Sequence, residues 1–88
     1  MPIISQFYGI IISMFFNEPD SHHKPHIHAR YNGIKATYDL ESNKIIGDMP
    51  AKQDKLIQAW IQIHKEELNS LWILMKEENE YFKIKPLD

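Results

Sequence analysis

The 88-residue sequence contains no cysteine. This absence excludes a disulfide framework, an all-cysteine zinc site and a thiol nucleophile, so any catalytic or metal chemistry must use histidine, carboxylate or hydroxyl groups. Glycine is also scarce, with three residues, and neither a glycine-rich phosphate loop nor a Gly-x-Ser-x-Gly nucleophile motif is present. The sequence therefore gives no support to nucleotide hydrolysis at such a loop or to serine-nucleophile catalysis.

Long hydrophobic runs are missing as well. The most apolar stretch, residues 7–16, is too short to span a bilayer. A secretory signal would need a basic region before this stretch, yet the first basic residue is Lys24. Because no lipidation motif is present either, we expect a cytoplasmic protein without a membrane segment.

A strong excess of charge of one sign is absent too. Ten basic and 12 acidic residues give a formal net charge of -2, so nucleic-acid binding is only weakly supported. A chain of 88 residues can build one compact core, which predicts a single domain over residues 1–88. Self-association would add buried surface to so small a core, and we therefore expect a homodimer.

Extended segments are expected in the first half of the sequence. Residues 10–16 are rich in isoleucine, phenylalanine and methionine without helical spacing, which predicts a buried strand. Gly9 predicts a bulge where the chain enters this strand. Residues 17–25 contain two prolines and almost no apolar residue, so they predict a loop.

A β-hairpin is the strongest local signal in the sequence. Residues 26–31 and 34–40 flank Asn32-Gly33, the dipeptide most typical of a two-residue hairpin turn. A second turn at residues 41–43 leads to a short strand at residues 44–46. Together with the preceding strand, these segments predict an antiparallel meander.

The second half predicts an amphipathic helical segment. Asp48 is the expected cap and Pro50 is tolerated in the first turn. Neither glycine nor proline interrupts residues 51–79, a long stretch for a small domain, so we expect a break near residues 64–66 and leave one helix or two open. Apolar and charged side chains alternate towards the end of residues 81–85, which predicts a last strand before the final proline. The expected fold is α+β, a small antiparallel sheet of three to five strands packed against the C-terminal helical segment.

Candidate chemistry concentrates in four closely spaced histidines, His22, His23, His26 and His28. Side chains at i and i+2 of a strand share a face, so His26 and His28 should lie roughly 6 to 7 Å apart with Ile27 pointing to the core. With His22 or His23 from the loop they could form a three-nitrogen zinc site. Without metal, the pair suits general acid–base catalysis. A polar strand face with solvated histidines is the simplest alternative.

Other side chains could complete this site. Arg30 continues the same strand face and could hold a phosphate or carboxylate. Tyr38 and Asp39 on the paired strand are conceivable supporting partners of the histidines. His64, alone on the helical segment, is more typical of a structural histidine than of a ligand.

Three segments of the sequence resemble a small prokaryotic family of domains of unknown function, DUF family 4160. They are residues 1–12 (MPIISQFYGIII), residues 25–31 (PHIHARY) and residues 60–68 (WIQIHKEEL). The usual family pattern begins M-P-x-I-S-x-F-Y-G-I and continues with H-x-P-P-H-F-H-A-x-Y. Lys24 stands where the family usually has a proline, and residues 18–21 lengthen the approach to the histidines.

The resemblance carries its own expectations. It maps the recurrent histidines of the family onto His22, His26 and His28. It also implies a role as one partner of a toxin–antitoxin-like pair, with a protein partner encoded nearby. The leading hypothesis is therefore a small accessory or interaction protein. The alternatives are a hydrolase or ribonuclease that uses His26, His28 and Arg30, and a metal-binding module in which His22, His26 and His28 bind zinc.

Overall fold

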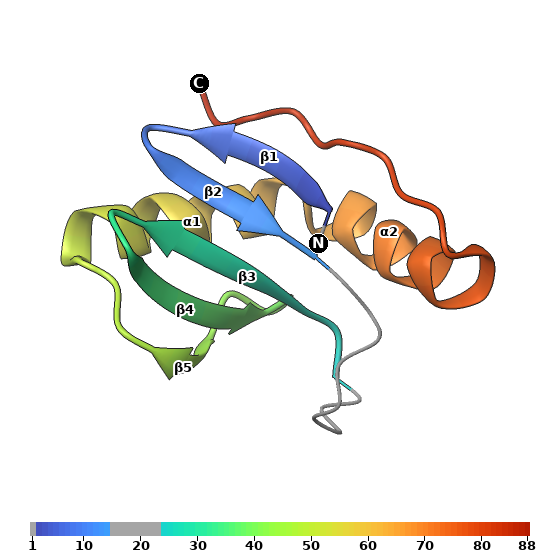
Figure 1. Ribbon diagram of the computed structural model, residues 1–88, viewed down its shortest axis with the longest axis horizontal. Coiled ribbons are helices and arrows are strands. Elements are labelled where there is room, and N and C mark those ends of the chain that lie inside the picture. The colour runs from blue at the N-terminus through green and yellow to red at the C-terminus, as the bar shows by residue number, and fades with distance from the viewer. Residues whose placement is uncertain (1, 15–23) are drawn as a thin grey trace.

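The computed structural model describes residues 2–14 and 24–88. Within these residues, five strands form one antiparallel sheet in the order of the chain, and two helices follow (Figure 1). This arrangement confirms the predicted α+β fold and meander. The elements are β1 (Ile3–Phe7), β2 (Ile10–Ser13), β3 (His26–Tyr31), β4 (Ile34–Asp39), β5 (Lys44–Gly47), α1 (Ala51–Ile63) and α2 (Lys65–Glu78).

Two tight hairpins shape the sheet. Asn32 and Gly33 connect β3 to β4 with φ values of 48° and 80°, the left-handed geometry of a type I′ turn, so the predicted hairpin is confirmed. Tyr8 and Gly9 connect β1 to β2 with φ values of 49° and 79°. The predicted bulge at Gly9 is therefore wrong, because this glycine belongs to a turn and a further strand, β1, precedes it.

The first predicted strand is described only in part. β2 ends at Ser13, and the Met14 N–H donates to the Pro2 carbonyl over 3.2 Å. The remainder of that predicted strand, most of the predicted loop, and both His22 and His23 lie outside the described residues.

The helical segment divides at His64, which ends α1 and precedes α2, as the expected break near residues 64–66 requires. Pro50, with φ −56° and ψ 145°, takes the N-cap position without a side-chain cap. The predicted cap at Asp48 is wrong because a proline disfavours helical geometry in the residue before it, so the helix begins only after Pro50. No described helix is long and apolar enough to cross a membrane.

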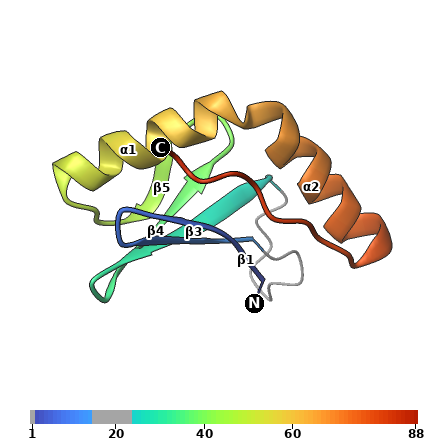
Figure 2. The same ribbon diagram turned by 90° about the horizontal axis from the view of Figure 1, so that it is seen from above.

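Both helices cover the same face of the sheet (Figure 2). Ile12, Ile27 and Tyr38 from the strands and Trp60 from α1 are fully buried between the two layers. The rings of Phe7 and Trp60 lie 5.5 Å apart within this core. Among residues 2–14 and 24–88, no helix packs on the opposite face, the open face of the sheet.

The predicted last strand at residues 81–85 is extended, as expected, but it does not form a strand of the sheet. The segment after α2 is extended and runs beside β1 in the same direction (Figures 1 and 2), but it does not form a ladder. Ile84 N–H donates to the Ile4 carbonyl over 2.8 Å, the single backbone hydrogen bond that joins this segment to β1. The next donor in a parallel ladder would be residue 86, which is a proline and has no N–H.

Candidate functional site

The register of the sheet places two rows of side chains on the open face. Ser13, His28, Thr37 and Ile46 are successive cross-strand partners from β2 to β5. The Thr37 hydroxyl lies 3.3 Å from His28 Nδ1, so this row contains a hydrogen-bonded pair of side chains. The row thus presents two hydroxyls and an imidazole near the middle of the sheet.

The second row is cationic. Ile11 faces Arg30, and Arg30 faces Lys35 across β3 and β4. Arg30 and Lys35 are both exposed, and neither forms an ion pair with a carboxylate of the described residues. The positive charge of this row is therefore not neutralised within the described part of the chain.

The two rows line a groove of about 350 Å³ on the open face. Its polar lining is Ser13, His28, Arg30, Lys35 and Thr37, and its apolar lining includes Ile3, Ile11 and Ile46. A groove of this volume is at the small end of ligand sites. Its combination of paired cations, hydroxyls and isoleucines suits an anionic group attached to an apolar body.

His26 and His28 meet as their spacing predicts. Their ring centroids lie 5.1 Å apart with the planes nearly perpendicular, and Ile27 between them is fully buried. Only 3% of His26 is exposed, and its ring packs against Trp72 of α2 with centroids 5.2 Å apart. His28 is thus the more accessible of the two and lines the groove, whereas His26 lies against α2 at the edge of the core.

The hydrogen bond of His26 defines its tautomer. His26 Nδ1 lies 2.8 Å from the Lys24 carbonyl oxygen, which can only accept, so Nδ1 carries the proton. In a neutral ring the lone pair then resides on Nε2. This is the arrangement found in many histidine metal ligands, in which the other ring nitrogen donates to a carbonyl.

The third proposed ligand, His22, is not among the described residues, so the three-histidine site is not tested. Within residues 2–14 and 24–88, no group of three His, Asp or Glu side chains is placed to hold a metal ion. Zinc binding therefore depends on His22 and stays a prediction.

Asp39 stabilises a turn. Its carboxylate accepts hydrogen bonds from the backbone N–H groups of Glu41 and Asn43, both at 2.9 Å, and pairs with Lys24 at 3.2 Å. Burial alone would raise the pKa of Asp39, but the hydrogen bonds from Asn43, Lys24 and Glu41 together hold it below its usual value. Asp39 is also the cross-strand partner of His26, but the hydrogen bonds described for its carboxylate go to the turn and to Lys24, so its expected role as a supporting partner of the histidines stays a prediction.

Tyr38 points to the opposite side of the sheet. Its hydroxyl donates to Asp54 of α1 over 2.5 Å, and burial together with this carboxylate raises the pKa of Tyr38 well above its ordinary value. The expectation that Tyr38 supports the histidines is therefore wrong, because strand alternation turns it towards the helices.

His64 has structural contacts. Its Nδ1 lies 2.6 Å from the Glu67 carboxylate, and its ring packs against Trp60 with centroids 5.5 Å apart. These contacts agree with a structural histidine at the junction of the two helices.

Ser13, Lys35 and Thr37 line the groove but were not among the predicted site residues. Two of them could have been found, because a two-residue turn at Asn32-Gly33 sets the pairing of Arg30 with Lys35 and, two residues on, of His28 with Thr37. Ser13 could not, since the long connection after β2 leaves the register of that strand open.

A family model described as Domain of unknown function (DUF4160) matches residues 9–73. The chain belongs to this family. The matched range runs from the first hairpin into α2 and includes the histidine pair and both cations of the open face. No curated protein and no solved structure shows a match to the chain. Membership in DUF4160 therefore supplies a family without an assigned activity, and any function must be argued from the site.

Proposed function

We propose that this DUF4160 protein is an accessory interaction protein whose open face binds an acidic, partly apolar segment of a partner protein. The observation that carries the proposal is the direct pairing of Arg30 with Lys35 in the lining of the groove. Like charges opposite each other destabilise an antiparallel sheet. A partner carboxylate placed between the two cations would remove this repulsion and accept charge-assisted hydrogen bonds from both.

The lining of the groove favours a protein partner over a nucleic acid. Among the described residues, no Phe, Tyr or Trp lines it, so the His28 imidazole is the one ring there on which a base could stack. The chain also carries a net charge of -2, which does not attract a polyanion over long distances. Three isoleucines beside the cations instead provide the apolar contacts that are typical of protein interfaces.

The family resemblance guides the choice of partner. We propose that the partner is encoded nearby, as in toxin–antitoxin-like pairs, and that the complex forms in the cytoplasm. The open face would then serve recognition, with Arg30 and Lys35 binding the acidic group.

The proposal can be tested by NMR titration with a peptide of alternating glutamate and leucine. We expect amide shifts to concentrate at the open-face rows of β2, β3 and β4, and to disappear in the Arg30→Gln/Lys35→Gln double variant. The control is Lys52→Gln/Lys55→Gln, which makes the same charge change on α1 and should bind like the wild type. An equal loss of peptide binding in both double variants would show that the effect depends only on the net charge of the chain. Tighter binding of an oligouridylate than of the peptide would overturn the choice of a protein partner.

A second candidate is a histidine-dependent hydrolase or ribonuclease. The observation that favours it is the 5.1 Å separation of the His26 and His28 rings beside Arg30 on the same strand. His28 would act as general base and Arg30 would hold the phosphate, while the buried His26 would position His28. Cleavage of a fluorogenic RNA substrate that is lost in His28→Ala would support this activity.

A further inference from the structure

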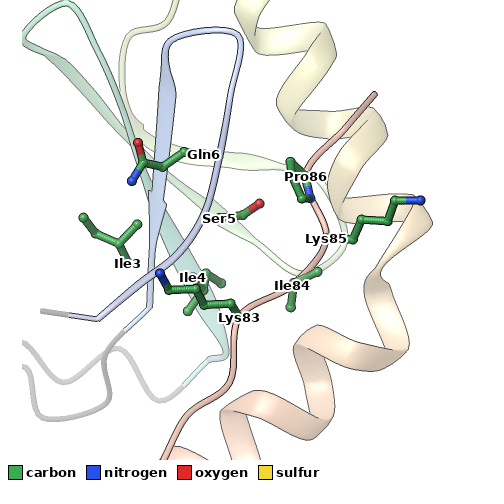
Figure 3. Close-up of a pocket in the computed structure, with 8 residues that line it drawn as sticks. All are labelled: Ile3, Ile4, Ser5, Gln6, Lys83, Ile84, Lys85 and Pro86. Carbon is green, nitrogen blue, oxygen red and sulfur yellow. The ribbon is translucent and has the colours of Figure 1, made fainter.

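A hollow separates the edge strand β1 from the C-terminal segment. It has a volume of about 390 Å³ and lies between Ile3–Gln6 of β1 and residues 83–86 (Figure 3). Regular neighbouring strands are about 4.8 Å apart and leave no such space. The C-terminal segment therefore lies where a sixth strand would lie, but it does not pair with β1 as a regular strand.

The backbone explains why this position is incomplete. The hydrogen bond from Ile84 N–H to the Ile4 carbonyl begins a parallel ladder. The ladder would continue with Gln6 N–H donating to the Ile84 carbonyl and with residue 86 donating to the Gln6 carbonyl. The first bond is not formed, and Pro86 cannot form the second. The N–H and C=O groups of Gln6 are thus left without strand partners at the edge of the sheet.

Ser5 gives independent evidence for a missing partner. Its side chain is only 6% exposed, and its hydroxyl has no hydrogen-bond partner. Figure 3 shows this hydroxyl directed from β1 towards the C-terminal segment. In the parallel register Ser5 faces Ile84, whose side chain offers neither a donor nor an acceptor. A buried polar group left in this state is rare in native proteins and indicates a partner that is absent.

The C-terminal segment is attached to the domain through a few residues, among them Leu87, which is partly buried against the core. Ile84 is its buried anchor at 3% exposure, and the Trp60 indole N–H donates to the Lys85 carbonyl over 2.9 Å. Tyr81 and Phe82 stay exposed. Since the Trp60 bond uses a backbone carbonyl, any extended peptide in the same register could replace it.

We propose that the edge of β1 accepts an extended strand from a partner protein, and that the C-terminal segment of this chain occupies the site until it is displaced. The partner strand runs parallel to β1. It carries threonine in the place of Ile84, so that its hydroxyl bonds Ser5, and it has no proline in the place of Pro86, so that the ladder reaches Gln6. This site is separate from the open face and does not depend on the function proposed for it.

The test uses fluorescently labelled peptides and the full chain. One peptide has the native sequence of residues 80–88, and a second carries Pro86→Val. The receptor is the Ile84→Ala chain, in which the competing segment has lost its anchor, and Phe82→Ala is the control because Phe82 is exposed. We expect the Pro86→Val peptide to bind Ile84→Ala at least ten times more tightly than the native peptide, and more tightly than it binds the control. Equal binding of the two peptides, or no binding to a folded Ile84→Ala chain, would overturn the proposal.

A second pair of peptides tests the contact with Ser5. Both carry Pro86→Val, and they differ in having threonine or valine at position 84. The threonine peptide should bind more tightly to Ile84→Ala, and an added Ser5→Ala substitution should remove the preference. A preference that persists without the Ser5 hydroxyl would show that the assigned contact is wrong.

If Ile84→Ala does not fold, the chain itself provides the test. Pro86→Val in the full chain restores the donor to the Gln6 carbonyl. As the ladder closes, the Gln6 N–H also meets the Ile84 carbonyl, so amide hydrogen exchange at Gln6 should slow at least tenfold. Unchanged exchange at Gln6 would overturn the proposed strand position.

Discussion

Arg30 and Lys35 lie directly opposite each other on β3 and β4, and the described residues supply neither with an anionic partner. The Asn32-Gly33 turn enforces this pairing, because a two-residue hairpin fixes the register of its strands. The sheet thus holds two cations together at a cost in stability. The acidic group that we propose for this site would remove the repulsion between the two cations.

The first prediction separates stability from binding at this pair. Lys35→Glu replaces a like-charge pair by an opposite-charge pair, so the free energy of unfolding should rise by about 0.5 to 1 kcal/mol. The same change should abolish binding of the acidic peptide. Urea denaturation and peptide titration measure the two effects. Lys55→Glu on α1 is the matched control and should leave peptide binding intact; a loss of stability in Lys35→Glu would contradict the repulsion.

The second prediction compares two glycines that have positive φ angles. Gly33, at φ 80°, has open space where a Cβ would stand, so Gly33→Ala should cost only the backbone strain of about 1 kcal/mol. Gly47, at φ 92°, faces β4, and a Cβ there would overlap the Lys35 carbonyl and lie 2.9 Å from Ala36 Cα. Gly47→Ala should therefore cost at least about 2 kcal/mol. Equal urea midpoints for the two variants would refute the close approach at Gly47.

The third prediction concerns alkaline pH. Burial and the bond to Asp54 raise the pKa of Tyr38 in the folded state, whereas an unfolded tyrosine ionises near pH 10. The stabilisation is therefore complete below about pH 10 and is lost as the pH rises further. Tyr38→Phe should be about 1 to 2 kcal/mol less stable at pH 7, and this gap should narrow above about pH 10. Urea melts of Tyr81→Phe, an exposed control, should keep the wild-type alkaline slope; a gap independent of pH would disprove the linkage.

Local signals in the sequence predicted the elements that depend on local physics. Asn32-Gly33 defined a hairpin because that turn needs two positive φ angles, and the helical periodicity with a break near residue 64 came from spacing alone. The first hairpin was missed because tyrosine rarely adopts the positive φ that Tyr8 has. Its turn therefore lacks the usual asparagine or aspartate signal.

The features that the sequence did not predict depend on contacts between residues far apart in the chain. Alternation in residues 81–85 suggested a strand, but whether it joins the sheet depends on the hydrogen-bond register against β1, which assigns Pro86 to a donor position. Likewise, the histidine pair follows from i, i+2 spacing, whereas the burial of His26 results from Trp72 on a distant helix. Spacing cannot reveal such a contact.

The fourth prediction is the homodimer expected from the small size of the chain. Ile63 and Ile73 on the helices remain more than half exposed, at 64% and 53%, and an interface would bury apolar surface of this kind. Sedimentation velocity at high micromolar concentration should give twice the 10.5 kDa chain mass. A species of 10.5 kDa at that concentration would rule out the dimer.

The last prediction tests zinc binding at the histidine pair. If His26 and His28 bind zinc with His22, calorimetric titration should show one site per chain in the wild type. His26→Ala and His28→Ala should each weaken binding at least tenfold, because a zinc site of this kind needs three protein ligands. His64→Ala is the matched control, since this imidazole is paired with Glu67 on α2, and it should bind zinc like the wild type. Affinity should fall below about pH 6.5, since protonated imidazoles cannot ligate a metal. Equal, negligible heats from the wild type and all three variants would eliminate the metal site.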